Sequence, residues 1–396
     1  MKDLINSKVD EIYTKVLEYR RHIHSNPELS FKEYNTSKYI IQQLNTLDIY
    51  NTQITETGVI ALIGEGDNCV ALRADIDALP IFEETNLEFS SKNNGIMHAC
   101  GHDMHTSMLL GVAEVLKSIE SKLNGVVKLI FQPGEEKVPG GASIMIEAGV
   151  LENPKPKAIF GQHIFPATKT GTISINSGPF FASADELYWT ITGKGGHAAQ
   201  PHLSNDSILA AANLITFYQS MITKFRNPLN PGVLSITAIN GGSATNIIPD
   251  EVTMMGTLRS FDEKWRFEMH ELLVSKSQEL AKLYNCHCEL RIEKGYPALV
   301  NNSECSQFVL DTASQTLGYE NSNIIEPVMF GEDFAFYAQK IPAAFWFLGV
   351  NPDLNNIMPP LHNSKLSPDE FAMKNGMKVM CNIAYNFLKN NGKIAQ

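Results

Sequence analysis

Short apolar runs alternate with longer stretches of helical periodicity along much of this chain. Four of the runs are typical of buried strands: 69–74 (CVALRA), 126–132 (VVKLIFQ), 158–163 (AIFGQH) and 345–350 (FWFLGV). Between the first two, residues 103–120 carry apolar side chains at helical spacing. Strands that alternate with helices form a largely parallel sheet covered by helices. The sequence therefore predicts a three-layer α/β domain with a mostly parallel sheet.

The pattern changes near residue 184. From there the predicted elements follow the order strand–helix–strand–strand–helix–strand, with strands at 186–193, 233–240, 251–259 and 286–294 and helices from Asp206 and Asp262. This is the ferredoxin-like (βαββαβ) order, a split βαβ arrangement. A chain of 396 residues is also long for one compact core. We expect a large domain made of residues 1–183 and 298–396, with residues 184–297 inserted as a second domain.

The charge balance limits the classes of partner. Lys and Arg total 32 against 43 Asp and Glu, for a formal net charge of -11. This balance predicts neither a nucleic-acid nor a membrane partner, because both require a basic surface. The N-terminal residues lack the apolar core of a secretory signal, and six scattered cysteines do not suggest a disulfide scaffold. A cytoplasmic location is expected.

One short segment, His98–His105 (HACGHDMH), concentrates metal-binding side chains. Three His, one Cys and one Asp offer ligands suited to an ion such as Zn or Mn. A glycine between Cys100 and His102 allows these two side chains to converge on one ion. The alternative is a polar loop that caps the following helix, but capping requires neither a cysteine nor three histidines.

Two adjacent carboxylates, Glu135 and Glu136, come directly after the strand at 126–132. One of them can bind a metal while the other takes a proton from a bound water. Taken alone, a Glu-Glu pair is more often a solvated turn. His163 ends another predicted strand and His362 follows the strand at 345–350; each histidine alone is a weak signal.

These candidates gain weight from their shared position. Each lies at or just beyond the carboxyl end of a predicted strand, where ligands bind in open α/β sheets. Together they offer enough donors for two ions and too many for one tetrahedral ion: Cys100, His102, Glu136, His163 and His362. Two ions about 3.5–4 Å apart would share a water and lower its pKa.

Eight motifs occur in one order between about Arg20 and Phe387. They are RRHIHSNPELSF, LRADIDALPI, HACGHDMHTSMLLG, FQPGEE, GKGGHAAQPH, GGSATNIIPD, GTLRSFD and MPPLHN. In this the chain resembles the M20 metallopeptidase family, specifically its amidohydrolase branch of N-acyl-amino-acid deacylases, hippurate hydrolases and auxin-conjugate hydrolases. All eight motifs in this order are specific to the family, whereas any one motif alone is a weak signal.

The resemblance implies roles for the residues of the large domain. Two divalent ions per subunit (Zn, Mn, Co or Ni) would be bound by Cys100, His102, Glu136, His163 and His362. Glu135 would be the base that activates the bridging water. Asp75 would orient one of the ligands without binding the metal itself, as metal sites usually require.

The resemblance also implies a role for the inserted domain, as a lid and a dimerisation domain. His197 would reach the site of a partner subunit and stabilise the oxyanion, while Asn246 and Arg259 would hold the substrate's carboxylate. Arginine suits this role because its planar fork binds a carboxylate through two hydrogen bonds. Without the resemblance, GKGGH would be an ordinary turn and Arg259 a surface residue.

The implied activity is hydrolysis of the amide bond of a small N-acyl amino acid by a homodimer or higher homo-oligomer. Cleavage of short peptides, as by a carboxypeptidase or dipeptidase, stays open. Two further alternatives are a cysteine hydrolase that uses Cys100 as its nucleophile, and a catalytically silent binding protein. Lys137 and Gly331 depart from the family pattern and leave the substrate preference open.

Overall fold

The structure is a computed structural model that describes residues 1–393 and divides into two compact units. The large unit comprises Met1–Phe180, Val300–Glu326 and the chain from Asp333 onward. The inserted unit comprises Phe181–Leu299 and the short segment Pro327–Glu332. Each unit has its own hydrophobic core.

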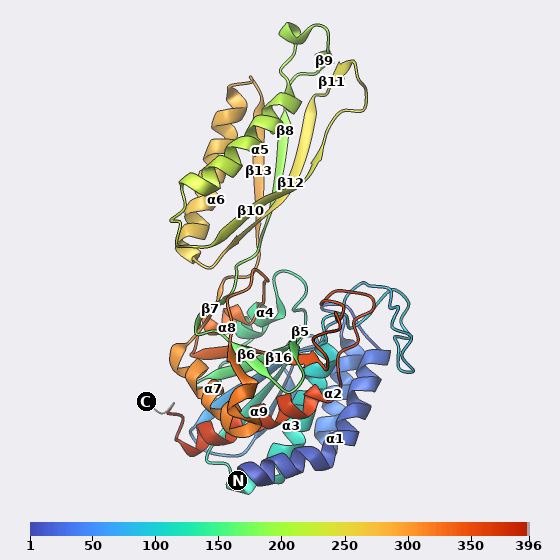
Figure 1. Ribbon diagram of the computed structural model, residues 1–396, viewed down its shortest axis with the longest axis vertical. Coiled ribbons are helices and arrows are strands. Elements are labelled where there is room, and N and C mark those ends of the chain that lie inside the picture. The colour runs from blue at the N-terminus through green and yellow to red at the C-terminus, as the bar shows by residue number, and fades with distance from the viewer. Residues whose placement is uncertain (394–396) are drawn as a thin grey trace. The chain divides into compact units, whose positions relative to one another are not determined.

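An eight-stranded sheet forms the centre of the large unit (Figure 1). Its strands, in spatial order, are β1 (Tyr50–Gln53), β2 (Val59–Ile63), β4 (Val126–Gln132), β3 (Cys69–Asp75), β5 (Ile159–Lys169), β16 (Ala343–Asn351), β6 (Ile173–Ile175) and β15 (Ser322–Ile324). The four central strands β4, β3, β5 and β16 are parallel to one another, whereas β2 joins β4 and β6 joins β16 in antiparallel orientation. Two further short strands, β7 (Gly178–Phe181) and β14 (Leu299–Asn301), pair with each other.

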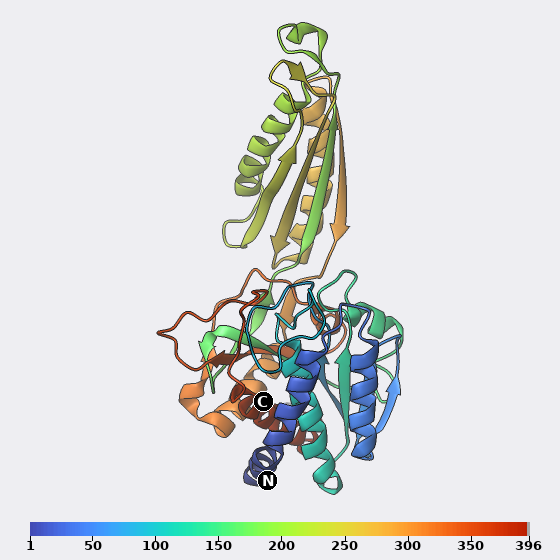
Figure 2. The same cartoon turned by 90° about the vertical axis from the view of Figure 1, so that its right-hand side faces the viewer.

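Helices cover both faces of this sheet (Figure 2). One face carries α1 (Lys2–Ser25), α3 (His102–Ser118), α7 (Ser303–Leu317) and α9 (Ala372–Lys389), and Phe160 of β5 meets rings of α7 and α9 there. The other face carries α4 (Gly141–Glu147) and α8 (Ala335–Ala338), while α2 (Tyr34–Thr46) packs beside β1 and β2. Every residue of β3, β4 and β16 is buried, which is why their sequences are mostly apolar, with a few buried polar residues such as Arg73 and Lys128.

The register of the parallel strands aligns the ends that carry the candidate residues. Asp75, the last residue of β3, lies opposite Gln132, the last residue of β4. Arg73 lies opposite Gly161, so His163 of β5 comes level with the end of β3. The expected gathering of strand ends at one edge of the sheet therefore follows from the register.

A buried ionic cluster joins α1 to the start of α3. The carboxylate of Asp103 contacts Nε of Arg20 at 3.1 Å and Nδ1 of His24 at 2.9 Å, and Glu83 contacts Nε2 of His24 at 3.2 Å. Burial lowers the pKa of His24, but the two carboxylates outweigh it and raise the pKa to about 9. The motif that begins at Arg20 thus anchors the helix that carries His102.

The inserted unit contains a four-stranded antiparallel sheet and two long helices. The spatial order is β10 (Gly232–Asn240), β12 (Glu251–Ser260), β8 (Asp185–Thr192) and β13 (His287–Lys294), with α5 (Ser207–Lys224) and α6 (Glu263–Lys282) packed on it. Asp206 and Asp262 cap the two helices by accepting the N–H groups of Leu209 and Trp265. A two-stranded ribbon of β9 (Gly196–His197) and β11 (Ile247–Ile248) completes the unit.

The predicted fold class is confirmed: a largely parallel α/β sheet carries an inserted βαββαβ unit. Among the described residues, no helix combines the length and the hydropathy that a membrane span needs.

Candidate metal centre

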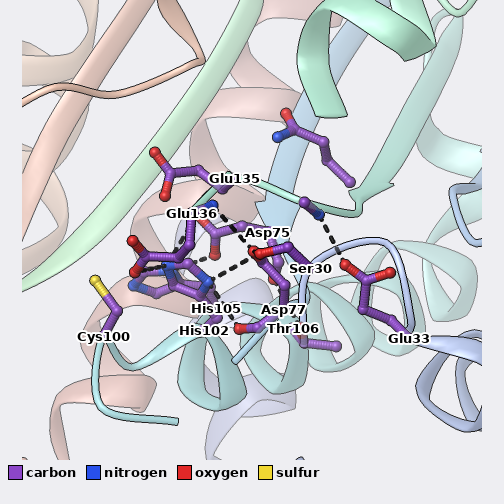
Figure 3. A network of polar contacts seen from close by, with 12 residues as sticks. Ser30, Glu33, Asp75, Asp77, Cys100, His102, His105, Thr106, Glu135 and Glu136 are labelled. Atoms are coloured by element: carbon purple, nitrogen blue, oxygen red, sulfur yellow. Dashed lines mark hydrogen bonds and ion pairs between the residues drawn. The ribbon is translucent and has the colours of Figure 1, made fainter. Parts of the chain in front are cut away.

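The loop after β4 carries Glu135 and Glu136, and both side chains reach toward the same cluster of donors (Figure 3). Gly134 has a φ of +60°, a left-handed conformation that suits glycine, and its carbonyl accepts the N–H of Gly141 at 3.0 Å. The N–H of Glu136 donates to Asp77 Oδ2 at 3.0 Å. This tight turn explains how two adjacent carboxylates come to reach the same cluster.

Cys100 and His102 converge because of the glycine between them. Gly101 has a φ of +82°, and a Cβ at this position would lie 2.2 Å from the side chain of Ile164. Any other residue would therefore be both strained and in collision. His102 is the first residue of α3, so its ring is fixed by the start of the helix.

His163 and His362 reach the same place from different elements. Nδ1 of His163 lies 2.7 Å from the carbonyl oxygen of Ile164, while its Nε2 lies 3.3 Å from Sγ of Cys100. His362 has a φ of +63°, and its N–H donates to the carbonyl of Ala99 at 2.8 Å. Its Nε2 lies 3.1 Å from Oε1 of Glu136.

The expected metal ligands are thus brought together. Three groups of donor atoms overlap, each with all its atoms within 4.8 Å of one another: Cys100, His102 and His163; Cys100, Glu136 and His362; and His102, Glu135 and Glu136. The five donors come from α3, β5 and three loops, so a closed site is built from segments far apart in the sequence.

One buried nitrogen shows that this donor set fits a cation. Nδ1 of His102 lies 3.0 Å from the carbonyl oxygen of Asp77 and 3.2 Å from its Oδ1, which places the ring proton on Nδ1. Nε2 of His102 is fully buried and has no hydrogen-bond partner among the described residues. A buried lone pair without a donor is costly, and a metal ion would satisfy it.

The electrostatic surroundings favour a cation as well. Burial lowers the pKa of His102, but Asp75, Asp77 and Glu136 outweigh it and raise the pKa to about 10. A proton and a metal ion compete for the same lone pair, and the same carboxylates attract both.

The environment of Cys100 is the opposite of what a nucleophilic cysteine needs. Burial, followed by the carboxylates of Glu136 and Glu135, raises the pKa of its thiol well above the usual value. A cysteine nucleophile needs a depressed pKa, which neighbouring positive charges provide. The geometry thus favours Cys100 as a ligand, whose thiolate a bound cation would stabilise.

Two aspartates, Asp75 and Asp77, contact histidines of this site. Oδ1 of Asp75 lies 2.6 Å from Nδ1 of His105, which is outside the expected ligand set, whereas Asp77 contacts His102. Nε2 of His105 in turn accepts the N–H of Ile164 at 2.9 Å, next to His163. Sequence reasoning placed Asp77 and His105 beside the site but gave them no role.

The substrate-binding candidates of the inserted unit separate into two places. His197 pairs with Ile247 in the β9–β11 ribbon, and the carbonyl of Asn246 accepts the N–H of Ala198 at 3.0 Å. Arg259 lies at the far end of β12, opposite Val233. The eight steps from Glu251 to Arg259 span roughly 26 Å at about 3.3 Å per residue, so Asn246 and Arg259 of one chain do not meet.

A layered α/β sheet with a cluster of thiol, imidazole and carboxylate donors at its edge is the architecture of a metallohydrolase. Residues 71–386 match the model of Peptidase family M20/M25/M40, and the chain belongs to this family. It is therefore a hydrolase that acts on amide or peptide bonds.

Similar proteins cover nearly the whole chain. Thermostable carboxypeptidase 1 of Saccharolobus solfataricus is 37% identical over 395 residues, covering 97% of this chain and 98% of its own. N-acetyl-L-cysteine deacetylase of Bacillus subtilis is 37% identical over 377 residues, covering 94% and 88%. The Bacillus subtilis YXEP protein, described as a dinuclear metal-binding peptidase from the M20 family, superimposes with a TM-score of 0.81 at 35% identity, covering 96% of this chain and 99% of its own.

Replacing Cys100 by alanine should weaken metal binding without removing a covalent nucleophile. Because a ligand is lost, we expect the affinity for Zn or Mn to fall at least about 10²-fold, as measured by competition with a chelator. C381A, which removes another fully buried thiol, from α9, is the matched control and should keep wild-type affinity. An acyl group trapped on Cys100, or full activity of metal-free enzyme, would contradict the assignment.

Proposed function

We propose that this protein is a metal-dependent amidohydrolase that removes the acyl group from small N-acyl amino acids. The observation that carries the proposal is the pair of adjacent carboxylates, Glu135 and Glu136, which converge with His102 beside the thiol and imidazole donors. Cleavage of short peptides is the second candidate, favoured by the similarity to a carboxypeptidase. Both reactions break an amide bond next to a free carboxylate.

In this proposal two divalent ions are bound by Cys100, His102, Glu136, His163 and His362. When bound, such ions polarise the scissile carbonyl and lower the pKa of a water towards neutrality. Thiolate, imidazole and carboxylate donors suit Zn, Mn, Co or Ni. Asp77 holds the ring of His102, so that its Nε2 stays directed into the site.

Glu135 is placed to move the proton. Its side chain is buried, lies within the donor group of His102 and Glu136, and has the N–H of Asp333 at 3.4 Å from Oε1. A carboxylate held there can accept a proton from the attacking water and deliver it to the leaving nitrogen. Glu136, whose Oε1 lies 3.1 Å from Nε2 of His362, is the metal ligand of the pair.

The separation within the inserted unit supports a site made by two chains. A small substrate cannot reach both the His197–Asn246 end and the Arg259 end of one sheet, which are roughly 26 Å apart. We therefore propose a homodimer in which His197 and Asn246 come from one chain and Arg259 from the other. In this proposal residues 184–297 act as lid and dimerisation domain, and His197 donates to the developing oxyanion.

We also place the protein in the cytoplasm. All six cysteines are unpaired and buried, which fits a compartment that keeps thiols reduced. Detection in a secreted or periplasmic fraction would contradict this location.

A panel of substrates separates the two candidate activities. N-acetyl and N-benzoyl amino acids should be hydrolysed faster than dipeptides by the enzyme loaded with Zn, Mn, Co or Ni in turn. A clear preference for dipeptides under every metal would favour the peptidase.

The variant E135Q should bind metal normally and lose turnover. The amide cannot accept the proton, so kcat should fall at least about 10²-fold while metal content stays at the wild-type value. The neighbouring variant E136Q is the matched control, because it should lose metal as well as activity. If E135Q retains near-normal kcat, Glu135 is not the base.

The variant R259A tests whether the substrate carries a free carboxylate. Two charge-assisted hydrogen bonds of about 1.5–3 kcal/mol each would be lost, so kcat/KM should fall by two to three powers of ten or more, up to about four. R259K should recover only part, since an ammonium lacks the planar fork. R291A, which removes an exposed arginine from β13, is the control and should behave as wild type.

An amidated substrate sharpens this test. The wild-type enzyme should hydrolyse it poorly, and R259A should make it little worse because the interaction is already missing. An equal loss on carboxylate and amide substrates would show that Arg259 has a structural role only.

Co-expression of the two inactive variants H197A and R259A should restore activity. In a mixed dimer one site would combine Arg259 of the first variant with His197 of the second, so about one quarter of all sites should be intact after random pairing. If both residues served the same site within one chain, every site would carry a defect and no activity would return.

A further inference from the structure

The chain between α1 and α2 covers the loop that carries Glu135. Ser30 Oγ donates to Asp77 Oδ2 at 2.7 Å, and the N–H of Ala78 donates to the carbonyl of Glu28 at 2.8 Å. Leu29 forms an isolated β-bridge with Ala78. Residues 28–33 therefore contact the segment Asp77–Ala78, and Asp77 of this segment also accepts the N–H of Glu136.

Glu33 is the most deeply enclosed residue of this segment, with no exposed surface. Its Oε1 accepts the N–H groups of Gly134 and Phe31, both at 2.8 Å, and its Oε2 accepts the hydroxyl of Thr57 at 2.8 Å. Burial, together with the negative charge of Asp77, raises the pKa of Glu33 to about 7. Burying a carboxyl group is costly, and these three donors offset the cost.

Phe31 holds the same loop from the side. It has a φ of +63°, which is unusual for a bulky residue, and the N–H bond to Glu33 stabilises this turn. A Cβ on Gly134 would lie 2.2 Å from the ring of Phe31, so the ring packs directly on the glycine. Phe31 and Glu33 thus restrain one residue of the loop by packing and by a hydrogen bond.

The loop is fastened by a carboxylate on each side of Glu135. Glu33 accepts the N–H of Gly134 just before it, and Asp77 accepts the N–H of Glu136 just after it. Asp77 also contacts His102, so its substitution would disturb a metal ligand. Within the described residues, Glu33 has no hydrogen bond to an expected ligand, and its only bond to the loop goes to the backbone N–H of Gly134.

We propose that Glu33 is a positioning residue for Glu135, acting through the backbone N–H of Gly134. This inference rests on the proposed role of Glu135 as the base. A misplacement of about 1 Å in a reacting group can cost on the order of 10²-fold in rate, so a single backbone bond is enough to matter.

The test compares E33A with T57V in the full-length, metal-loaded enzyme. T57V removes the hydroxyl bond to Oε2 of Glu33 but leaves its bond to Gly134, which makes it the matched control. In E33A we expect kcat to fall about 30- to 100-fold, with KM within about threefold and metal content unchanged. In T57V we expect kcat within about threefold of wild type, even where its melting temperature falls as far as that of E33A.

Amide hydrogen exchange gives a readout that does not depend on activity. The peptide 132–141 should exchange at least about tenfold faster in E33A than in wild type, and at the wild-type rate in T57V. E33Q keeps an acceptor oxygen for Gly134, so both its exchange rate and its kcat should stay within about fivefold of wild type. If E33A does not fold, the shorter carboxylate of E33D replaces it and should show the same direction of change.

The outcomes separate this inference from the proposed function. Unchanged exchange in E33A and E33D, or equal losses of kcat in E33A and T57V, would overturn the positioning role whatever the substrate is. A folded E33Q that is as inactive as E33A would assign the effect to charge and would also overturn it. Faster exchange of 132–141 in a protein that hydrolyses no N-acyl amino acid would support the role of Glu33 while contradicting the proposed function.

Discussion

The arrangement of the large unit's sheet edge depends on one buried guanidinium. Arg73 lies on β3 without exposed surface and contacts Asp75 Oδ2 at 2.7 Å, Asp333 Oδ1 at 2.8 Å and Gln132 Oε1 at 2.9 Å. Burying a charge is costly unless it is paired, and these partners supply the pairing. The three partners belong to different segments: Asp75 ends β3, Gln132 ends β4, and Asp333 precedes α8. Because an unpaired buried group is costly, these bonds keep the three segments next to one another. Asp75 extends this network, because its other oxygen contacts Nδ1 of His105. Nε2 of His105 in turn accepts the N–H of Ile164, the residue after His163.

The same edge of the sheet concentrates negative charge around the expected metal ligands. Several buried carboxylates surround the imidazole and thiol donors, and they raise the pKa of both His102 and Cys100. This local excess differs from the net charge of -11, which is summed over the whole chain. A site that attracts protons this strongly in the absence of metal also attracts divalent ions, and the orphaned Nε2 of His102 marks one place where an ion would bind.

Within the inserted unit, the length of one strand has a functional consequence. β12 separates the ribbon that carries His197 from Arg259, and an antiparallel strand of ten residues cannot bend enough to bring its ends together. The polar groups that we propose for substrate binding are therefore divided between the two ends of the sheet. This division is the physical basis for proposing a second chain at each site.

Local pattern alone determined the layered fold, the inserted βαββαβ order, the caps Asp206 and Asp262, and the gathering of donors at strand ends, because periodicity and strand polarity are properties of neighbouring residues. The edge strand β1 was missed because its half-exposed YNTQ sequence carries no apolar signal. Only the tertiary structure decided that Asp77 contacts His102 and that Glu33 binds the loop at Gly134. Asp77 and His102 are 25 positions apart in the sequence, and Glu33 and Gly134 are 101 positions apart. Such distant pairs depend on how α2 and the β3–α3 connection pack against the sheet, and no local sequence pattern specifies them.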